Sequence, residues 1–583
     1  MSKFFITNNK EISEKIIKEI NSSEFKLCFN TQCDNIFAFA TQKLKVPHTN
    51  SLEINNDFII TNGTLIYKEG NKIENWKQLY NDYNNNIKVI RQSSIGNYAI
   101  CIKKGNSIDI WGEESGAFNI FYYNEKGIFL VSNSLYDLAK LIKEKISINE
   151  LNVIEEAAQF TILGDETIFN EIKRLSGTQH INIQDNSFNI IEEKILYPVL
   201  NIDAKKCAFN VATILKQKAN SIYNSLGNPG INMTGGLDAR ISLAAYLSVS
   251  SKPFLNYGIG NTGLTNTKDE DLRIDLLFQK KYGLDLRIGS WRTPTPLNRD
   301  WEYYISKYGF GAYVYSASAD VMNYYENSQG NIMTFGFGGE LYRNLPWIEN
   351  RTKTYFNVDE FIDEYYITGD AKLMTQDIPN YREHIKKKII KLCERYNLNP
   401  SHIDNVDNFY LLVEYRKTAD SKILNLVNMM KFSNLLLMEK ECLENARVDI
   451  ENMNQSKFML QIINNLSRDI LDIPIFSHCQ SRIYDKASES LLPERKPLKI
   501  LIKQNIKHII PPILLNYIRK NIQYNHKRSQ NEVLVFLKQY LNSFSHNILS
   551  EECLEKINYQ PKISKYALNL AIIKSIYEHK TEN

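Results

Sequence analysis

The sequence predicts an α/β protein in which antiparallel sheets come first and a parallel sheet follows. Two patterns carry this prediction. Over the first ~195 residues, short apolar runs end in turns that contain Gly or Asn, which is typical of β-hairpins. After residue 204, strand-like and helix-like segments alternate at the spacing of βαβ units, which indicates a parallel sheet with crossover helices.

In the first part, strands are expected at runs such as FKLCF, DFIITNG, NYAICIKKGNS and HINIQDNS. Two helices are expected between them, near Leu135 to Leu141 and near Ile148 to Phe160. We therefore assign residues 1–195 to one domain of layered antiparallel sheets with flanking helices.

In the second part, a helix is expected over Ala208 to Leu226. Short parallel strands are expected at Ile231 to Met233 and at 254–257, 284–291 and 332–335. From about residue 355 onward the Leu and Ile spacing predicts that almost the whole chain is helical. We assign residues 200–523 to a second domain and residues 524–583 to a helical C-terminal extension.

Composition restricts the classes of function. The 583 residues are 43% hydrophobic and 23% charged, as in folded globular proteins. The net charge is only +4, so we expect no nucleic-acid partner. No run of ~18 apolar residues occurs, so we expect no membrane span. The first residues lack the apolar core of a signal peptide and the eight cysteines form no CxxC pair, so we expect free thiols and a cytoplasmic location.

The strongest motif is TGGLDAR, residues 234–240, between a short strand and a helix. Gly235 and Gly236 allow a tight turn that points backbone N–H groups into one concavity, and the helix N-terminus adds partial positive charge. Thr234, the two glycines and Asp238 are therefore candidates to hold a phosphate group, with Asp238 placed to hold Mg²⁺ against it. A plain βα turn is the alternative.

Two further features are candidates for the same site. The run GFGGE, Gly336 to Glu340, ends another strand, and ligands of parallel sheets bind at the carboxyl ends of strands. Glu340 is then expected to face the same crevice as Asp238 and to supply a second metal carboxylate; a solvated loop is the alternative. The acidic run Asp269-Glu270-Asp271 precedes a helix, where it is expected mainly to complement the helix dipole.

These residues resemble the asparagine synthetase family, which includes β-lactam synthetases and lasso-peptide cyclases. The resemblance covers roughly residues 1–520. TGGLDAR is similar to the family's SGGxDS loop for ATP, and residues 336–341 are similar to its GEGSDE loop, with Glu340 at the place of a metal-binding aspartate. Tyr257-Gly258, followed by the acidic pair Asp269-Glu270, resembles the family's second strand element. The resemblance implies that Tyr257, Gly258 and Gly336 join an ATP site and that Asp238 and Glu340 hold Mg²⁺.

The resemblance also implies a catalytic lysine. A C-terminal family segment reads K-x-x-L-R and then, after a short gap, Leu-Pro. Lys499 to Lys503, followed by Ile510-Pro511, is similar, and Lys499 has the family spacing of the active-site lysine. Its implied role is to stabilise charge on the carbonyl and phosphate oxygens. Glu444 and Arg447 loosely resemble the family's E-x-R-x-P segment, although the proline is absent.

The first part resembles the glutamine-hydrolysing domain of this family, which has an N-terminal-nucleophile hydrolase fold. Asn62-Gly63 is similar to its NGE turn, residues 96–99 to its GxFA strand and residues 116–122 to its RDxxGxxPLYY hairpin. The family's nucleophile is a cysteine at position 2, where this chain has Ser2, and the Arg–Asp pair of the hairpin is Gly112-Glu113. We expect the fold to be kept and glutamine hydrolysis to be lost; an unprocessed serine nucleophile is the alternative.

Two substitutions also change the ATP-binding half. Ala239 replaces the last serine of the ATP loop, and Phe337 replaces a glutamate that assists amination in asparagine synthetase. Arg240 is expected either to bind phosphate in place of the lost hydroxyl or to be solvated at the start of the helix. We therefore expect ATP to be used, but not for the amidation of aspartate by ammonia.

The function implied by the resemblance is an ATP-dependent, AMP-forming amide ligase that uses Mg²⁺. It would adenylate a small-molecule or peptide carboxylate and join it to an amine or ammonia without its own glutaminase. Positioning and charge neutralisation supply most of the rate in such chemistry. One alternative is intramolecular amide closure, as in lasso-peptide or β-lactam cyclases. The other is a non-catalytic descendant that binds nucleotide or a partner.

Overall fold

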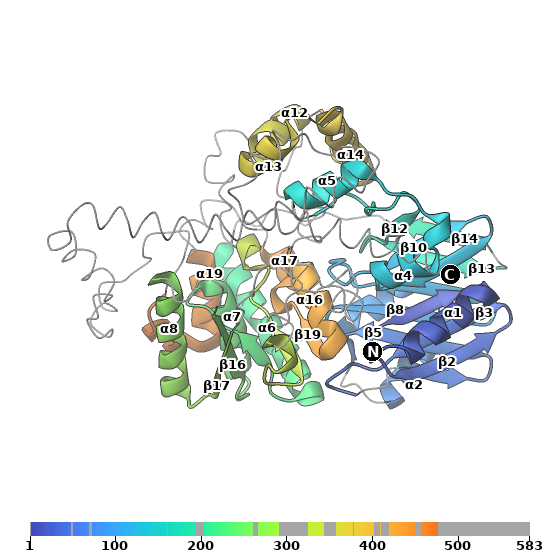
Figure 1. Ribbon diagram of the computed structural model, residues 1–583. Coiled ribbons are helices and arrows are strands. Elements are labelled where there is room, and N and C mark those ends of the chain that lie inside the picture. Colours follow the sequence, from blue (N-terminus) through green and yellow to red (C-terminus); the bar gives the residue numbers. More distant parts are fainter. Residues whose placement is uncertain are drawn as a thin grey trace, which may run out of the picture.

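The chain is described from a computed structural model. The described residues are 2–47, 51–68, 73–84, 86–159, 161–185, 187–193, 203–259, 266–290, 324–342, 357–376, 378–401, 409, 419–446, 448 and 457–475. No helix within these ranges is long and apolar enough to cross a membrane. Figure 1 shows two main bodies side by side, with a small group of helices above them.

The first body contains two antiparallel six-stranded sheets and a two-stranded ribbon. The first sheet, in the order β12-β10-β11-β1-β3-β2, contains β1 (Phe4–Thr7), β2 (Leu27–Cys33), β3 (Ile36–Thr41), β10 (Phe121–Glu125), β11 (Ile128–Ser132) and β12 (Ile172–Arg174). The second, in the order β14-β13-β9-β8-β5-β4, contains β4 (Ser51–Ile54), β5 (Asp57–Gly63), β8 (Tyr98–Lys104), β9 (Ser107–Gly112), β13 (Gln179–Gln184) and β14 (Ser187–Glu192). The ribbon consists of β6 (Ile66–Tyr67) and β7 (Ser94–Ile95).

The two six-stranded sheets share one apolar core. Alternate side chains of both sheets point into it, among them Phe4 and Ile6 of β1 and Ile110 of β9. Because successive side chains of a strand point to opposite faces, each sheet also has an outer face to cover. This layered antiparallel architecture confirms the fold expected for the first part.

Helices cover the outer faces of the two sheets. α1 (Lys10–Asn21) and α4 (Leu135–Leu141) lie on the first sheet, whereas α2 (Ile73–Asp82) and α3 (Ile87–Gln92) pack over the second. α4 and α5 (Glu150–Gln159) were expected, but the expectation of only two helices is wrong, since α1, α2 and α3 are present as well. In α1 the signal was available, because apolar residues recur at helical spacing after the N-cap residue Asn9.

The second body contains a five-stranded parallel sheet in the order β17-β16-β15-β18-β19. Its strands are β15 (Gly230–Asn232), β16 (Phe254–Ile259), β17 (Leu286–Ser290), β18 (Ile332–Thr334) and β19 (Phe432–Asn434). All four neighbouring pairs are parallel, as the sequence predicts. After residue 355, where almost everything was expected to be helical, β19 pairs with β18. This strand was not expected, and it follows the helix that ends at Met430 after a single residue.

Helices pack around the parallel sheet. The described α-helices of this body are α6 (Ala204–Leu226), α7 (Leu237–Leu247), α8 (Asn266–Tyr282), α16 (Ala419–Met430), α17 (Lys440–Ala446) and α19 (Lys457–Ser467). Among the described residues of the chain, short 3₁₀ segments are η1 (Lys143–Lys145), η3 (Gly339–Tyr342), η7 (Leu436–Met438) and η9 (Arg468–Asp472).

A polar seam joins the two bodies. Backbone N–H groups of Leu44 and Lys45 donate to the carbonyl oxygens of Met429 and Met430 at the end of α16, at 3.1 and 2.8 Å. In the same seam, the backbone N–H of Leu435 donates to Oδ1 of Asn97 at 2.8 Å. The two bodies are thus held together by specific hydrogen bonds, which fix their relative position more closely than apolar contact alone.

The third group of helices packs on the first body, although it follows the parallel sheet in sequence. It contains α12 (Val358–Phe361), the π-helical segment η4 (Ile362–Tyr366), α13 (Gly369–Thr375) and α14 (Tyr381–Arg395). Its apolar side chains share a core with Ile154 of α5 and Leu163, and Lys388 forms a buried ion pair with Glu155. Figure 1 shows α12, α13 and α14 beside α5, at the top of the view.

Candidate functional site

The loop after β15 is held in place by a buried carboxylate. Gly235 lies between the strand and α7, and its backbone N–H donates to Oδ1 of Asp271 at 2.8 Å. Asp271 is fully buried and lies in the second turn of α8, so the interpretation of this residue as a dipole complement is wrong. Gly236 begins α7 as its N-cap without a side-chain hydrogen bond. The loop is therefore a turn at the N-terminus of α7, and the hydrogen bond from Gly235 to Asp271 holds it in place.

The second glycine-rich loop lies directly against the first. A Cβ atom at Gly336 would overlap the backbone nitrogen of Ala239, and one at Gly339 would overlap the carboxyl group of Asp238. Gly338 has φ +100°, a conformation that glycine adopts without strain. The two motifs, about a hundred residues apart in sequence, thus meet at the carboxyl ends of the neighbouring strands β15 and β18.

The metal ligands proposed from the sequence are only partly described. Asp238 is half-buried in the first turn of α7, next to Gly339. Glu340 follows in η3, but its side chain lies outside the described set. Within that set, no group of three or more His, Cys, Asp or Glu side chains is arranged to hold a metal ion. Magnesium binding by Asp238 and Glu340 stays a prediction.

Arg240 has a different environment from both of those expected. It is fully buried, so the expectation of a solvated side chain is wrong. Its guanidinium N–H groups donate to the carbonyl oxygens of Ile473 and Pro474, at 2.5 and 2.6 Å, and its guanidinium carbon lies 5.0 Å from the ring centroid of Phe278. These contacts tie α7 to the segment after η9 and turn the guanidinium away from the role of a phosphate ligand.

The two substituted positions of the loops are packed in apolar surroundings. Ala239 is a buried residue of α7 and belongs to the apolar core of the second body. The ring of Phe337 stacks on that of Phe335, with centroids 5.1 Å apart. Tyr257 is buried on β16, and Gly258 follows it at the carboxyl end of that strand. These side chains shape the sheet edge but bring no additional charge to it.

The remaining candidates of the second domain fall elsewhere. Lys499 and the Ile510-Pro511 pair lie outside the described residues, as does Arg447, so their placement stays a prediction. The side chains of Asp269 and Glu270 are not described either. Glu444 lies in α17 and lines a cavity between the two bodies.

Ser2, at position 2 of the chain, is enclosed and hydrogen-bonded by other parts of the protein. Ser2 is fully buried, and its Oγ lies 2.7 Å from the carbonyl oxygens of both Gln42 and Met429. Its backbone N–H donates to Thr41, and its carbonyl accepts from Asn133. Since every polar atom of Ser2 has a partner within the protein, this serine joins the first body to α16.

The cysteines near the start of the chain do not supply a replacement nucleophile. Cys28 is half-buried on β2, and its thiol lies 3.4 Å from the carbonyl oxygen of Ala40. Burial raises the pKa of this thiol, which reduces its thiolate fraction. Cys33 is buried in the core between the sheets. The six cysteines within the described ranges are all free, as expected.

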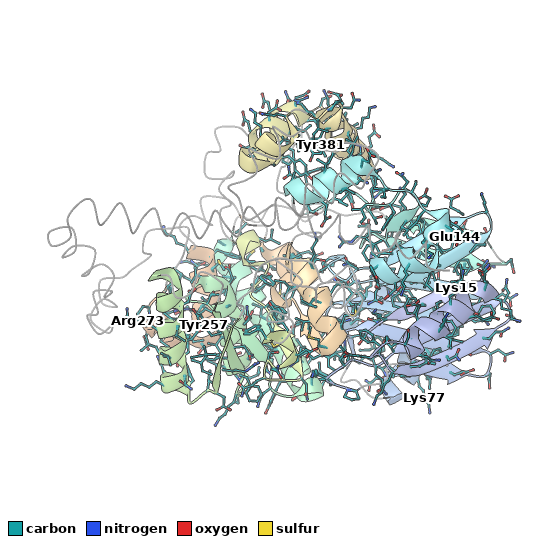
Figure 2. All side chains as sticks on the ribbon, viewed as in Figure 1. Lys15, Lys77, Glu144, Tyr257, Arg273 and Tyr381 are labelled. Atoms are coloured by element: carbon teal, nitrogen blue, oxygen red, sulfur yellow. The ribbon has the colours of Figure 1, made fainter. Side chains whose placement is uncertain are left out.

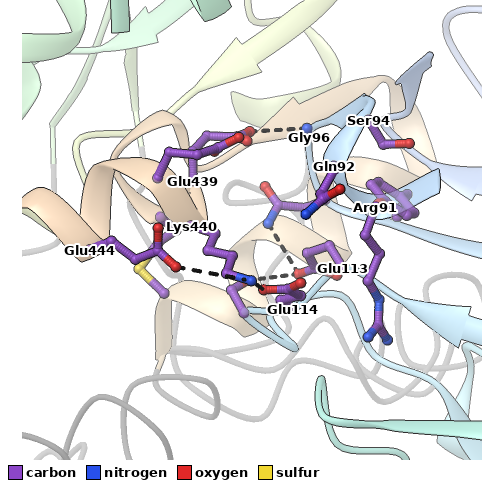
Figure 3. A pocket seen from close by; sticks show the side chains of 14 residues that line it. Arg91, Gln92, Ser94, Gly96, Glu113, Glu114, Glu439, Lys440 and Glu444 are labelled. Atoms are coloured by element: carbon purple, nitrogen blue, oxygen red, sulfur yellow. Dashed lines mark hydrogen bonds and ion pairs between the residues drawn. The ribbon is translucent and has the colours of Figure 1, made fainter. Parts of the chain in front are cut away.

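A cavity of about 190 Å³ lies between the two bodies (Figure 3). The first body contributes Arg91, Glu113 and Glu114 to its lining, and the second contributes Glu439, Glu441 and Glu444. Burial raises the pKa of Glu439 to about 7. Met438, the residue before Glu439, packs against Gly338 of the second glycine-rich loop. Sequence reasoning missed this site because its residues come from two domains and form no local motif.

Comparison with known proteins leaves the family open. No protein-family model and no curated protein matches the chain. Among solved structures, the chain is similar to glutamine phosphoribosylpyrophosphate amidotransferase from B. subtilis, solved with ADP and GMP, at 9% identity and a TM-score of 0.22, over 58% of this chain and 77% of that one. A second structure, described as the allosteric regulatory enzyme of purine biosynthesis, gives 9% identity and a TM-score of 0.23, over 51% and 82%. At these TM-scores the likeness carries no argument about this chain.

Two places in the molecule have the geometry of a ligand site. Two glycine-rich turns meet at one edge of a parallel sheet, where a half-buried carboxylate lies beside a helix N-terminus. Such an edge suits a phosphate-bearing ligand. The interdomain cavity is a separate place, rich in carboxylates and lined by side chains of both bodies.

Proposed function

We propose that this protein is an ATP-dependent, AMP-forming amide ligase that activates a substrate carboxylate. The observation that supports this most is the contact between the two glycine-rich loops at the carboxyl ends of β15 and β18, beside Asp238. Ligands of open parallel sheets bind at this edge. The sequence of each loop independently resembles a nucleotide-binding loop of asparagine synthetases.

In this proposal the first loop holds the phosphate groups. Thr234, Gly235 and Gly236 supply the turn, and Asp271 keeps the turn in place through the N–H of Gly235. Tyr257-Gly258 on the adjacent strand and Gly336 of the second loop complete the nucleotide site. Because both loops approach each other closely, the fit of ATP depends on glycine at these positions.

In this proposal, one lysine side chain and one metal ion neutralise the negative charge of the phosphate groups. Asp238 and Glu340 are the proposed ligands of Mg²⁺, and Lys499 is the proposed catalytic residue. Bound ATP would supply the adenylyl group that activates the carboxylate, with pyrophosphate as the leaving group. The side chains need only position the reactants and offset negative charge, which is where most of the rate arises in such reactions. Arg240 is not among the phosphate ligands of this proposal; its guanidinium donates to the carbonyl oxygens of Ile473 and Pro474 and, at 3.5 Å, to that of Gly235 in the first loop.

The amine is proposed to come from outside the protein. Ser2 is buried and bound at every polar atom, and the half-buried thiol of Cys28 has a raised pKa. The first body is therefore proposed to serve as a scaffold without glutaminase activity. The environments of Ala239 and Phe337 favour a second candidate, a nucleotide-binding protein without catalysis.

An exchange assay separates the two candidates. The protein would be incubated with ATP, Mg²⁺ and labelled pyrophosphate across a panel of amino-acid and peptide carboxylates. A ligase should return label to ATP with at least one carboxylate. A non-catalytic descendant should bind ATP, measured by calorimetry, and return none. Formation of ADP in place of AMP would contradict the proposed reaction.

A further inference from the structure

Two turns of the first body form one unit at the seam between the bodies. The backbone N–H of Thr64 donates to the carbonyl oxygen of Asn97 at 2.8 Å, so the two turns are bonded to each other. Gly96 has φ +107°, and a Cβ atom there would lie 2.3 Å from the carbonyl oxygen of Thr64. Glycine adopts this conformation without strain and leaves room for the close approach. Residues 62–64 and 96–97 are therefore packed against each other closely.

This unit holds the segment that follows β19 at both of its ends. The segment consists of η7 and its two flanking residues, Leu435 and Glu439, and it links β19 to α17. Oδ1 of Asn97 accepts the backbone N–H of Leu435 at 2.8 Å. At the other end, the backbone N–H of Gly96 donates to Oε1 of Glu439 at 3.0 Å (Figure 3). Because both hydrogen bonds come from the first body, the position of η7 depends on the seam.

The side chain of Asn97 is itself held in a fixed orientation. It is 4% exposed, and its Nδ2 donates to Oε1 of Glu113 at 3.1 Å. This second hydrogen bond determines which way the amide group points, so that Oδ1 faces the N–H of Leu435. A buried N–H that loses its acceptor costs free energy. The amide group of Asn97 is therefore important for the position of Leu435.

The middle of η7 supports the second glycine-rich loop. Leu437 and Met438 are buried, and a Cβ atom at Gly338 would lie 3.2 Å from side-chain atoms of both. The hydroxyl group of Tyr342, at the end of η3, donates to the carbonyl oxygen of Leu437 at 2.6 Å. The loop is thus held on η7 by side-chain packing and by a buried hydrogen bond.

The same loop reaches Asp238. A Cβ atom at Gly339 would lie 2.3 Å from Oδ1 of that carboxyl group. Since β18 and β19 are paired and parallel, the loop after β18 and η7 after β19 lie at the same edge of the sheet. A continuous series of contacts therefore runs from Asn97 through η7 and the loop to Asp238. Packed side chains and hydrogen bonds of this kind are a physical route by which one body can position part of another.

We propose that the first body positions the second glycine-rich loop through η7, with Asn97 as the positioning residue. The consequence for ATP rests on the proposed function, whereas the consequence for the loop itself does not. The proposal gives a role to two turns that resemble glutaminase motifs, in a body for which no glutaminase activity is expected. Loss of the Asn97 amide group should free η7 and let the loop open more often.

Hydrogen exchange of the full-length protein without nucleotide tests the positioning. Asn97→Leu removes the acceptor and keeps a side chain of similar size, and amide exchange in residues 336–342 should become about tenfold faster. Asn425→Leu is the matched control. Asn425 is also buried at the seam, where its amide group bonds to the backbone of Asn119 and Ala117 at 3.0 and 2.9 Å. This control should leave exchange in residues 336–342 as in the wild type.

Calorimetry with ATP and Mg²⁺ tests the consequence for the nucleotide site. Asn97→Leu should weaken ATP binding by about tenfold, whereas Asn425→Leu should not, although both variants lose buried hydrogen bonds at the seam. Melting temperatures would be measured for both variants, because a purely structural role would lower them without this difference in affinity. If the wild type binds no ATP, the proposed function fails, and the exchange experiment still decides the positioning.

Two results would overturn the proposal. One is wild-type exchange in residues 336–342 of folded Asn97→Leu. The other is equal acceleration in Asn97→Leu and Asn425→Leu, which would show that the whole seam loosens. If Asn97→Leu does not fold, Tyr342→Phe removes only the hydroxyl group that donates to Leu437. Exchange of the loop should rise in that variant as well, and wild-type exchange there would contradict the role of η7.

Discussion

Ser2 and Asp238 both occupy positions where the resemblance to asparagine synthetases implies chemistry, yet their surroundings differ. Ser2 is fully buried, and its hydroxyl group contacts the carbonyl oxygens of Gln42 and Met429. Asp238 is half-buried at the N-terminus of α7, beside a glycine-rich loop from another part of the chain. One position is closed by the protein itself, and the other lies at a sheet edge where ligands bind.

This difference bears on the roles that we propose for the two bodies. A polar side chain whose hydrogen bonds all end on the protein stabilises the fold, and it gains nothing from access to a substrate. The carboxylate of Asp238 lies instead at the meeting point of two glycine turns, in the first turn of α7. We therefore propose the chemistry for the second body and a scaffold role for the first.

The largest expected effect is that of Asp238→Ala. If this carboxylate holds the metal ion, its loss should lower AMP formation by about 10³-fold, because metal neutralisation is a large part of the barrier reduction. The melting temperature should change little, since the residue is only half-buried. Asp285→Ala, at an exposed position before β17, is the matched control. Full activity of Asp238→Ala would contradict a role of Asp238 in the reaction. Asp238 and Ser2 would then not differ in function.

Lys499→Ala should lower the rate by about 10²-fold, the scale for loss of one transition-state charge partner. Lys496→Ala and Lys507→Ala, on the same basic stretch, should change it little, because surface lysines contribute little. Pyrophosphate release at saturating ATP would compare the three variants. Equal and small effects at all three positions would show that Lys499 is an ordinary surface lysine.

Gly339→Ala tests the contact between the two loops. Its added methyl group would overlap the carboxyl group of Asp238, so we expect a loss of activity together with a destabilisation of about 1–3 kcal/mol. Gly105→Ala adds a methyl group with no atom within 4 Å, at φ +60°, and should cost only about 1 kcal/mol without affecting activity. Denaturant unfolding and AMP formation would be measured for both. Wild-type behaviour of Gly339→Ala would mean that the loops do not meet as described.

Glu439→Gln should change how stability depends on pH. Burial raises the pKa of Glu439 to about 7 in the folded protein, so its favourable contribution is greatest at low pH and is lost as the pH rises through about 7. Glutamine does not titrate. The free energy of unfolding of the variant should therefore rise relative to wild type between about pH 5 and pH 8, by on the order of 2 kcal/mol. Parallel pH profiles would contradict the burial of this carboxyl group in the seam.

The smallest expected effect concerns Ser2. Purified protein incubated with glutamine should release no glutamate above background, because the hydroxyl group is buried and bound. Ser2→Ala should lower stability by about 1 kcal/mol through the lost hydrogen bond and should leave AMP formation unchanged. Steady glutamate release that Ser2→Ala abolishes would show that position 2 is a nucleophile after all.

Much of the fold was predictable because its signals are local. Local sequence patterns predicted both the turns of the first body and the βαβ spacing of the second. The expected strand at Ile332 to Phe335 matches β18 (Ile332–Thr334) closely. α1 was missed although its apolar residues recur at helical spacing. β19 was missed because it follows α16 after a single residue, and its place depends on pairing with a strand about a hundred residues away.

The candidate site was predictable only where its residues lie within one motif. The two glycine loops were found, and their meeting follows from the order of parallel strands. The roles of Asp271 and Arg240 were not, since each depends on contacts with distant segments. The interdomain cavity has no sequence signal at all, because Glu113 and Glu439 meet only when the two bodies pack together.

Side chains of both bodies are drawn in Figure 2, and one measurement compares the two bodies directly. Hydrogen exchange of the full-length protein would be measured with and without ATP and Mg²⁺. The account predicts slower amide exchange in residues 234–240 and 336–342 when nucleotide is added, and no change in residues 2–8. Protection at the start of the chain, or none at the two glycine loops, would contradict the assignment of the nucleotide site to the second body.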